Sequence, residues 1–356
     1  MKILVINPGS TSTKIAVFED ENNIFQKNLQ HDASDLKNFK IITEQFNFRK
    51  EAILDVLKEA GYDILSFQAV VGRGGMLHPV PSGVYEVNET MKRDLFDCRY
   101  GEHASNLGAF IAEDIAAQIP GARAFIADPV VMDELQDVAR IAGHPLFHRV
   151  SMFHALNHKA IAKAHAKKTG KPYESLNLIV AHLGGGISVG AHQKGKIIDV
   201  TNAVDGEGPF SPERSGGLPT LPLVKLCFSG KYTFDQIKKI LTGEGGMVAH
   251  LGTNQFQKIE KELIPSGDRQ AALIHEAMAY NVAKFIGAMA TVLKGAVDAI
   301  LLTGGIAYNA LMVQSIIEKV SFLAPVVVYP GEDEMGALAY NGLAAMRGEL
   351  EIQTYT

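Results

Sequence analysis

The sequence predicts an α/β protein with mixed sheets, and two observations support this prediction. Short apolar runs of strand length alternate along the chain with longer segments of helical apolar spacing. The pattern of strand, polar turn and strand at residues 2–18 returns at 178–189, as expected if one architecture is used twice. A chance match is the competing interpretation, because short patterns of this kind are common.

The first half of the chain contains clear signals for strands and helices. Segment 49–60 has apolar residues at helical spacing and ends before Gly61, and segment 153–168 ends before Gly170. The predicted strands of this half are 3–6, 13–18, 67–71 and 122–127, and the predicted helices are 49–60, 104–118 and 153–168.

The second half repeats this alternation. Strands are predicted around the glycine-rich turn in 178–189, in 299–306 and at 325–329, and helices at 268–295 and 333–347. The long apolar helix 268–295 fits burial within one subunit or a place in a dimer interface. We expect one domain over 1–150, a second over 151–332, and packing of the C-terminal segment 333–356 on the first domain.

The charge distribution favours a small-molecule function, with no nucleic acid and no membrane as partners. The formal net charge is -5 and no basic run occurs. The apolar stretches are shorter than a membrane span, and the N-terminal one is too short for a signal peptide. Cys98 and Cys227 form no CxxC pattern, which is typical of a reducing compartment. We therefore expect a cytoplasmic globular protein.

The opening turn, NPGSTSTK, places four hydroxyls and a lysine between two strands. Gly9 allows a ligand to approach the backbone, the hydroxyls can donate to phosphate oxygens, and Lys14 supplies positive charge. The same residues are ordinary material for a polar hairpin turn. This stretch alone leaves both interpretations open.

Two further glycine-rich turns follow predicted strands. HLGGGIS at 182–188 has three consecutive glycines, more than a simple hairpin needs, which favours close approach of an anion. LTGGIAYN at 302–309 has two glycines that can admit a nucleobase or ribose. A tight packing turn is the alternative in each case. Neither G-x-x-x-x-G-K-[ST] nor G-x-G-x-x-G occurs, which argues against a P-loop or Rossmann site.

These motifs together resemble those of one enzyme family. INPGSTSTK, HLGGGIS, PERSGGLP at 212–219 and LTGGIAYN occur in the order and spacing of the acetate kinase family, over essentially the whole chain. The resemblance implies the two-domain actin-like ATPase (ribonuclease-H-like) fold, with duplicated βββαβα cores and the nucleotide in the cleft between them. It also implies reversible, Mg²⁺-dependent phosphoryl transfer between ATP and a short-chain carboxylate.

The chemistry of that reaction calls for positive charge. A carboxylate substrate is already an anion at pH 7, so it needs no general base, but it must approach an anionic phosphate. Arg214 in PERSGGLP is expected to bind the transferring phosphoryl group through its fork of donors. Arg73 in VVGRGG is expected to bind the substrate carboxylate. Acetate kinases usually read RVVHGG there, so Arg73 takes the place of the family histidine, and Val70 stands near that of the arginine.

The resemblance also points to histidines. His182 aligns with the family histidine beside the phosphoryl group, where an imidazole can donate a hydrogen bond to a phosphoryl oxygen. His154 and His103 match family histidines too. We treat His154 as a catalytic candidate, with a structural role as the competing interpretation, and we interpret His103 as structural.

Acidic residues are the candidates for magnesium. Asp128 aligns with the family aspartate near the metal and is expected to contact Mg²⁺ or its waters, with Asn7 facing the same ion. The acidic run GEDEMG lies where the family carries a magnesium-binding NEE sequence; Asp333 is the ungapped match, and Glu332 and Glu334 are the neighbouring alternatives. A solvated helix N-terminus also favours such acids.

The ATP-binding candidates lie in the three turns. They are Asn7, Ser10, Ser12, Lys14, Gly184, Gly185, Gly186, Gly304, Gly305, Ile306 and Asn309.

The acid substrate is expected to be butyrate or a branched relative such as isobutyrate, because the motif wording is most similar to family members that act on butyrate. Butyrate has two more methylenes than acetate, each worth about 0.8 kcal/mol when buried. Met76 and Leu77 are candidates for the wall of the wider slot, or simply core. We expect a dimer or larger homo-oligomer. The alternatives are an acetate or propionate kinase and, from another class, a non-enzymatic actin-like nucleotide-binding protein.

Overall fold

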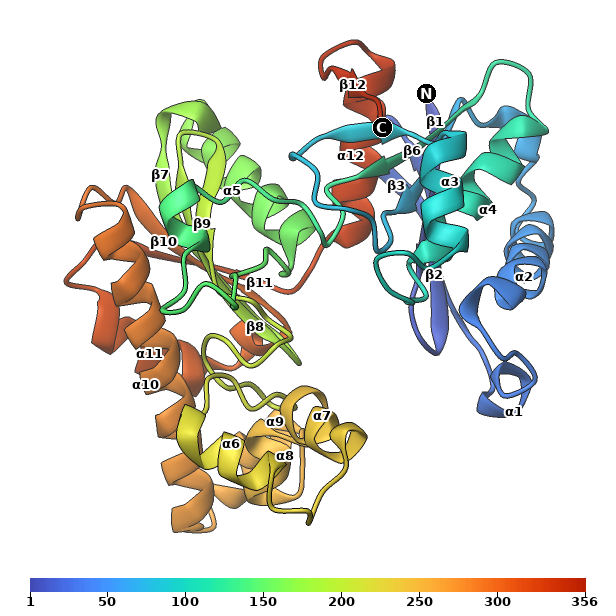
Figure 1. Ribbon diagram of the computed structural model, residues 1–356. Helices are drawn as coiled ribbons and strands as arrows, with labels where there is room; N and C mark the ends of the chain where they lie inside the picture. The colour runs from blue at the N-terminus through green and yellow to red at the C-terminus, as the bar shows by residue number, and fades with distance from the viewer. The chain divides into compact units, whose positions relative to one another are not determined.

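The computed structural model describes all 356 residues, and the chain divides into two compact units. The first unit comprises Met1–Asp133 and Asp333–Thr356, and the second comprises Glu134–Glu332. Each unit is built on its own mixed sheet (Figure 1). None of the helices is long and apolar enough to cross a membrane.

Residues 134–150, which we expected in the first domain, belong to the second unit. Polar contacts explain this: the guanidinium of Arg149 donates to Asp199 at 2.9 Å and also pairs with Glu207. Nζ of Lys159 lies 2.8 Å from a carboxylate oxygen of Glu134. These pairs tie the segment to the second sheet and to a helix packed on it.

The first unit contains a seven-stranded sheet. Its spatial order is β12 (Ile352–Gln353), β5 (Val84–Glu86), β6 (Arg123–Ala127), β4 (Ala69–Arg73), β1 (Lys2–Pro8), β2 (Ser12–Glu19) and β3 (Asn22–Gln30). Strand β2 runs antiparallel to both of its neighbours, β1 and β3, whereas β4 runs parallel to both β1 and β6.

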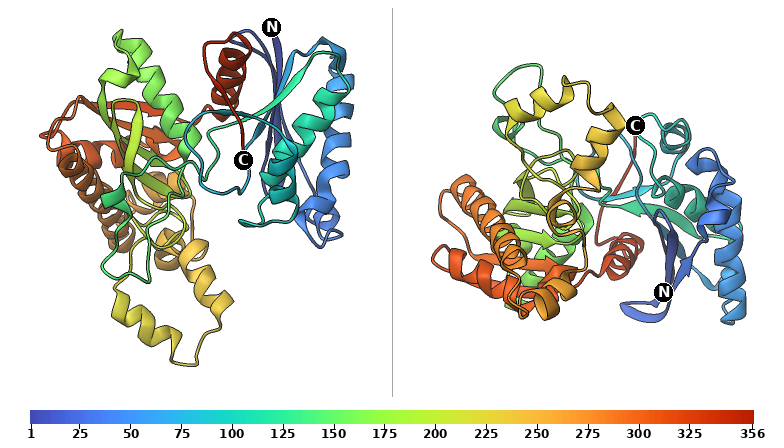
Figure 2. Two further views of the ribbon diagram at one scale, coloured as in Figure 1. Left: turned by 45° about the horizontal axis from the view of Figure 1, so that its top comes forward. Right: turned by 90° about the horizontal axis from the view of Figure 1, so that it is seen from below.

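Helices cover both faces of this sheet. Helices α2 (Phe46–Glu59) and α4 (Asn106–Ala117) lie on one face and α12 (Glu334–Met346) lies on the other, as Figure 2 shows. Strand alternation explains the two layers, because Leu4 and Ile6 of β1 join the core formed with α2 and α4. The remaining helices are α1 (Ala33–Leu36) and α3 (Glu89–Phe96).

The second unit contains a five-stranded sheet. Its spatial order is β11 (Val326–Pro330), β10 (Ala299–Gly304), β7 (Asn177–Leu183), β8 (Ile187–Gln193) and β9 (Lys196–Val200). Strands β7, β8 and β9 are antiparallel, and β10 runs parallel to both β7 and β11. The sheet therefore has the order and the strand directions of β6-β4-β1-β2-β3 in the first unit.

Helices also cover both faces of the second sheet. Helices α10 (Arg269–Val292) and α11 (Ala310–Val320) pack on one face, and α5 (Ala155–Thr169) packs on the other. Ten residues of the long helix α10 are buried, nine of them in this apolar core, so burial within the subunit accounts for most of its apolar character. The smaller helices are α6 (Thr220–Cys227), α7 (Phe234–Thr242), α8 (Gly246–Leu251) and α9 (Phe256–Lys258).

Short helical turns complete the structure. They are 3₁₀ turns at Ile42–Gln45, Ile64–Ser66, Asp137–Arg140, Tyr173–Ser175 and Gly305–Tyr308, and a π-helical turn at Ile259–Leu263.

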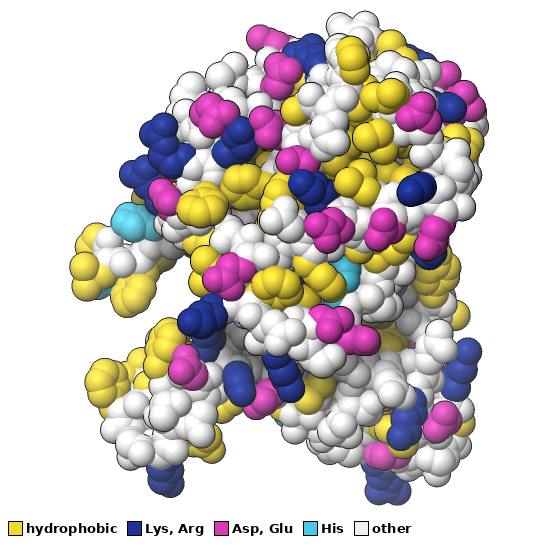
Figure 3. All heavy atoms as spheres, turned by 90° about the vertical axis from the view of Figure 1, so that its right-hand side faces the viewer, with side chains coloured by type: hydrophobic (Ala, Val, Ile, Leu, Met, Phe, Trp, Pro, Cys, Tyr) yellow, Lys and Arg dark blue, Asp and Glu magenta, His cyan; other side chains and the backbone are white.

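The predicted α/β class and the duplicated βββαβα core are confirmed. The core shared by the two sheets consists of three antiparallel strands, a helix, a strand, a helix and a strand, in that order along the chain, and the first sheet adds β5 and β12 to it. Every strand and helix predicted above has a counterpart in the structure. The sequence patterns did not predict β3, β9 or α11. These elements are either more polar than the predicted strands or lie outside the glycine-rich motifs. On the face drawn in Figure 3, acidic and basic side chains are interspersed.

Candidate functional site

Two equivalent turns carry most of the candidate residues. The first connects β1 to β2, where Asn7 pairs with Lys14, and the second connects β7 to β8, where His182 pairs with Ser188. Asn7 and His182 are each the penultimate residue of their strand. The correspondence between the two sequence motifs is therefore also a correspondence in the fold.

In the first unit, Asn7 lies in a small polar cluster with Arg73 and Glu334. Nδ2 of Asn7 donates to Oε2 of Glu334 at 2.7 Å, and Nη1 of Arg73 donates to Oδ1 of Asn7 at 3.3 Å. The same Nη1 lies 3.3 Å from Oε1 of Glu334. Arg73 makes no hydrogen bond through Nε or Nη2, so part of its donor fork remains available to a ligand.

The polar turn itself is held by Arg49, a residue that sequence reasoning missed. Its guanidinium is fully buried and donates to the backbone carbonyls of Gly9 at 2.8 Å, Ser12 at 3.0 Å and Ser10 at 3.1 Å. Gln45 accepts two further hydrogen bonds. Burial lowers the pKa of Arg49 to about 10, so the group stays charged at pH 7.

A sequence signal for Arg49 does exist. The buried residues of α2 are Arg49, Ile53 and Leu57, spaced four apart, so the arginine occupies the apolar stripe of its helix. A charged residue at such a position requires partners, because an unpaired buried charge is costly. With the carbonyls oriented toward Arg49, the hydroxyls of Ser10 and Ser12 make no hydrogen bond within the protein, and Lys14 is exposed.

In the second unit, the turn is tightened by its own backbone. The N–H of Gly184 donates to the carbonyl of Gly186 at 3.1 Å, and Oγ of Ser211 donates to the carbonyl of Gly185. A Cβ at Gly186 would lie 2.1 Å from Nη1 of Arg214. The third glycine of HLGGGIS therefore makes room for an arginine of the protein.

Arg214 is a partly exposed arginine with unused donors. Its Nη1 donates to the carbonyl of Ala203, while its other donors have no acceptor within the protein. Desolvation by burial lowers the pKa of its guanidinium, and the carboxylates of Glu213 and Asp205 oppose that effect. A desolvated, charged fork of this kind binds phosphoryl oxygens well.

A cavity of about 700 Å³ opens beside this turn. Of the sequence-predicted ATP-binding residues, Gly184, Gly185, Gly305, Ile306 and Asn309 line it. Pro212 and Glu213 of the PERSGGLP motif and Glu332 of the acidic run also line it, and the lining residues that sequence reasoning missed are Asn254, Gln255, Phe256, Gln257, Lys258, Lys261 and Glu262. These missed residues lie in segment 254–262 after α8, where the sequence is mostly polar and has no motif that distinguishes it from ordinary protein surface.

The two glycines of LTGGIAYN differ in role. Gly304 has a φ of +93°, and a Cβ there would lie 2.3 Å from the carbonyl oxygen of Leu183, so it serves the packing of β10 on β7 and does not line the cavity. A Cβ at Gly305 would meet no atom within 4 Å. Gly305 therefore leaves open space at the cavity wall.

His182 and His154 form a stacked pair. Their ring centroids lie 3.9 Å apart with an angle of 18° between the planes. Nε2 of His182 lies 3.1 Å from Oε1 of Glu332, while its Nδ1 is buried and makes no hydrogen bond. Nδ1 of His154 contacts Oγ of Ser188 at 2.9 Å. The side chain of Glu332 thus occupies one nitrogen of His182.

Three consecutive acids point to three different places. Glu332 contacts His182, as described above, and Glu334 contacts Asn7 and Arg73. Asp333, which the sequence comparison selected as a metal ligand, is the N-cap of α12 and accepts a hydrogen bond from the N–H of Gly336 at 2.8 Å. The helix-capping interpretation of this acidic run therefore applies to Asp333.

Asp128 lies directly after β6 with a φ of +38°, and its side chain is buried. Oδ1 accepts hydrogen bonds from Oγ of Ser82 at 2.6 Å and from the N–H of Gly83 at 3.0 Å. Oδ2 is buried without a partner. An orphaned carboxylate oxygen fits a cation or a metal-bound water, which are hard ligands that prefer oxygen.

His103, Leu77 and Met76 of the first unit make contacts within the protein. Nδ1 of His103 lies 2.8 Å from Oγ of Ser105, and burial lowers the pKa of His103, aided by the charges of Arg73 and Arg49. Leu77 is fully buried in an apolar core cluster, and Met76 packs against that cluster.

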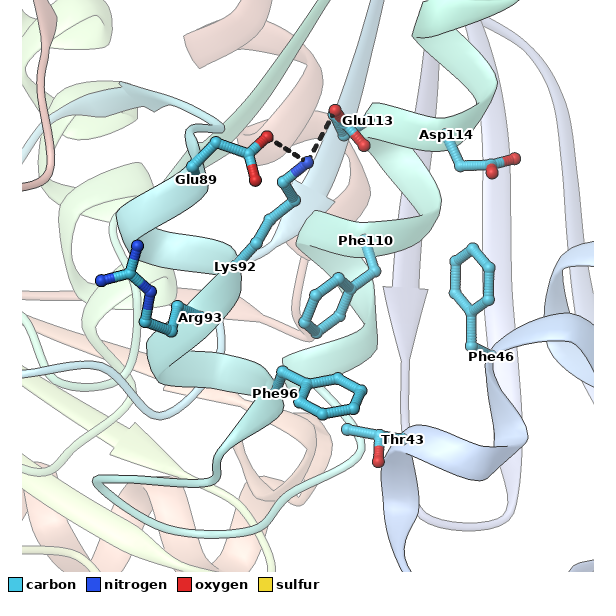
Figure 4. A pocket seen from close by; sticks show the side chains of 9 residues that line it. All are labelled: Thr43, Phe46, Glu89, Lys92, Arg93, Phe96, Phe110, Glu113 and Asp114. Carbon is cyan, nitrogen blue, oxygen red and sulfur yellow. Dashed lines mark hydrogen bonds and ion pairs between the residues drawn. The ribbon is translucent and has the colours of Figure 1, made fainter.

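A second cavity, of about 480 Å³, lies in the first unit (Figure 4). Phe46, Phe96 and Phe110 contribute aromatic walls, and Nζ of Lys92 is neutralised by Glu89 at 2.7 Å and Glu113 at 2.9 Å. It contains none of the candidate residues.

Comparison with known proteins agrees with these motifs. The sequence profile of the acetokinase family matches residues 146–327. Butyrate kinase 2 of Clostridium acetobutylicum is 56% identical over 354 residues, 99% of each chain. A probable butyrate kinase of Bacteroides thetaiotaomicron is 54% identical over 355 residues, 100% of each chain.

A solved structure supports the fold. The crystal structure of acetate kinase from Porphyromonas gingivalis superposes with a TM-score of 0.80, covering 97% of this chain and 99% of that one, at 21% sequence identity. The profile match and the full-length relatives show that the chain belongs to the acetokinase family.

Proposed function

We propose that this protein transfers the γ-phosphoryl group of ATP to the carboxylate of a short-chain fatty acid, with butyrate preferred over acetate. The main support for the proposal is the position of Arg214. Its desolvated guanidinium lies against the glycine turn of the second sheet, and only its Nη1 donates to an acceptor within the protein. Full-length relatives named butyrate kinase support the choice of acid.

ATP is proposed to bind in the cavity of about 700 Å³ in the second unit. Gly305 leaves space at its wall, and Asn309 and Ile306 contribute a polar and an apolar contact. Backbone N–H groups of the HLGGGIS turn would receive phosphate oxygens, because oriented amides in a glycine-rich turn form anion-binding concavities.

The acceptor carboxylate is proposed to bind the free donors of Arg73. The carboxylate attacks phosphorus directly and needs no base, so the task of the protein is to position and to neutralise. Arg214 would stabilise the charge that spreads over the phosphoryl oxygens, and the imidazole of His154 would donate to one of them. The hydroxyls of Ser10 and Ser12 are free to contribute further donors.

Magnesium fits one of the proposed ligand positions. The unpartnered Oδ2 of Asp128 would hold the ion or one of its waters, whereas Asn7 and Asp333 are engaged in contacts within the protein. When bound, Mg²⁺ neutralises phosphate charge in reactions of this class. Asp128 acts in this proposal by orienting and by charge, since the substrate brings no proton to remove.

A panel of acids tests the proposal. We expect the kcat/KM of the full chain to be higher for butyrate or isobutyrate than for propionate, and lowest for acetate, with ATP and Mg²⁺ present. Highest kcat/KM on acetate would refute the choice of butyrate, and activity on none of the four acids would refute carboxylate kinase activity.

We also propose that the protein self-associates. Leu221 and Val224 on α6 and Phe228 directly after it are exposed at helical spacing, and Phe234 at the start of α7 is also exposed, Phe228 and Phe234 by more than four-fifths. Large apolar side chains grouped in this way are typical of a protein–protein contact. Sedimentation of the wild type and of a Phe228→Ser, Phe234→Ser double variant tests this: we expect a dimer or larger oligomer for the wild type and a smaller species for the variant.

A further inference from the structure

A chain of polar side chains leads from His154 into the core of the second unit. Nδ1 of His154 lies 2.9 Å from Oγ of Ser188, which lies 3.0 Å from Nε2 of His158. Nδ1 of His158 lies 3.3 Å from Nε2 of His192, and Nδ1 of His192 lies 2.8 Å from the hydroxyl of Tyr173. This series of side chains therefore runs from the N-cap of α5, through strand β8, to the 3₁₀ turn that contains Tyr173.

Solvent is excluded from this chain. Ser188, His158 and His192 are fully buried. Gly190 of β8 provides room for the imidazole, because a Cβ at that position would lie 3.2 Å from Nδ1 of His158. Phe153 covers the same imidazole edge-on at a centroid distance of 5.1 Å. Burial lowers the pKa of both His158 and His192 well below the usual value, so each ring is neutral at pH 7.

Because these imidazole rings are neutral, the direction of one hydrogen bond in the series fixes the direction of the next. A neutral imidazole has one N–H donor and one acceptor nitrogen. The hydroxyl of Ser188 contacts two ring nitrogens, so it donates to one and accepts from the other. The hydrogens of the whole chain therefore point either toward His154, with all three rings protonated on Nε2, or away from it, with all three protonated on Nδ1.

One feature favours the first arrangement. A phenol is a better donor than acceptor, so Tyr173 at the inner end supplies a hydrogen to His192.

We propose that this chain of side chains, from Tyr173 to Ser188, holds His154 in the tautomer with its hydrogen on Nε2, so that His154 presents an N–H to the transferring phosphoryl group. The inference rests on the proposed function, because it takes His154 to face the phosphoryl group. The members of the chain are positioning residues that act through His154. The stacked neighbour His182 lacks such a chain, since Glu332 occupies its Nε2.

NMR spectroscopy can determine the tautomers of His154, His158 and His192 directly. Long-range ¹H–¹⁵N spectra of the full chain labelled with ¹⁵N-histidine distinguish Nδ1–H from Nε2–H, and single His154→Gln, His158→Gln and His192→Gln variants assign the signals. We expect Nε2–H for all three rings. Nδ1–H for His154 would overturn the proposal.

A matched pair of tyrosine variants tests the functional consequence. Tyr173→Phe removes the donor at the inner end and should allow Nδ1–H to appear at His154, lowering kcat about tenfold while the KM for ATP stays unchanged. Tyr329→Phe is the control, because its hydroxyl contacts Nδ1 of His165 at 2.9 Å in the same unit but belongs to no chain leading to His154. We expect wild-type kcat for that control.

The outcomes separate the inference from the proposed function. Unchanged kcat and an unchanged His154 tautomer in Tyr173→Phe would overturn the inference even if the wild type is an active kinase. If the wild type phosphorylates no acid, the proposed function fails, but the spectra still show whether the three rings share one tautomer and whether Tyr173 controls it. Equal melting temperatures for the two variants would exclude general destabilisation as the cause of a loss of kcat.

Discussion

The two sheets place an arginine beside equivalent turns, but they use it in opposite ways. In the first unit, the turn between β1 and β2 points three backbone carbonyls at Arg49, whose donors are all consumed by the protein. In the second unit, the turn between β7 and β8 closes through its own backbone, and Arg214 lies against Gly186 with donors left over.

This difference separates a structural arginine from a functional one. Arg49 is fully buried and every donor is paired, as a charge in a protein core must be. Arg214 is partly exposed and only Nη1 is engaged. Equivalent places in a duplicated fold therefore lead to different chemistry, and the number of unused donors distinguishes them.

The largest effect is expected for Arg214→Ala. Loss of the guanidinium should lower kcat by about 10³-fold, which is the low end for an arginine that stabilises a phosphoryl transition state, with ATP binding retained. Steady-state kinetics and nucleotide titration measure the two quantities. Arg269→Ala, an exposed arginine of the same unit, is the control. Wild-type kcat in Arg214→Ala would contradict the comparison.

Arg49→Met should instead act on stability. The change leaves three carbonyls of the turn without a donor, and we expect the free energy of unfolding to fall by about 3 kcal/mol in urea. Arg123→Met provides the control, because the pair of Arg123 with Glu86 is half-exposed and should cost under about 1 kcal/mol. A stable Arg49→Met protein would show that the first turn does not depend on this arginine.

Gly186→Ala should affect catalysis without unfolding the protein. The added methyl group would displace the Arg214 guanidinium, which is a flexible side-chain end, and a shift of about 1 Å in a catalytic group costs about 10²-fold in rate. Gly143→Ala introduces the same methyl group where no atom lies within 4 Å. Equal kcat values for the two variants would remove Arg214 from the reaction.

The smallest effect concerns pH. His158 and His192 are neutral when folded but can bind protons when unfolded, because burial lowers their folded pKa values well below 6.5. Stability therefore falls as the pH drops through the unfolded pKa of about 6.5, by about 1 kcal/mol for each histidine, or about 2 kcal/mol for both, between pH 6.5 and 5.5. Urea unfolding across this range measures the slope. His192→Gln should flatten it, and an equal slope in that variant would assign the pH dependence to other groups.

Much of the fold was predictable because its signals are local. Apolar runs and stop glycines located the central strands of both sheets and the helices that pack on them, and the repeated turn indicated duplication. The strand β3 was missed because seven of its nine residues are exposed, which leaves no apolar run.

The site was only partly predictable, because a glycine does not reveal what approaches it. Gly186 admits a guanidinium and Gly304 admits a backbone carbonyl, whereas Gly305 faces open space, yet all three belong to similar motifs. The neighbouring acids Glu332 and Asp333 diverge because the chain turns into α12 between them, so each side chain leaves the backbone in another direction. The direction in which a side chain points depends on local backbone dihedral angles, which residue identity alone does not determine.

The most direct test is to trap the acyl phosphate. The full chain, ATP, Mg²⁺, butyrate and hydroxylamine are incubated together, and butyryl hydroxamate is measured for the wild type, Arg214→Ala and Arg269→Ala. The account predicts hydroxamate with the wild type and with Arg269→Ala, and about 10³-fold slower formation with Arg214→Ala. No hydroxamate with the wild type, or equal rates with Arg214→Ala, would contradict it.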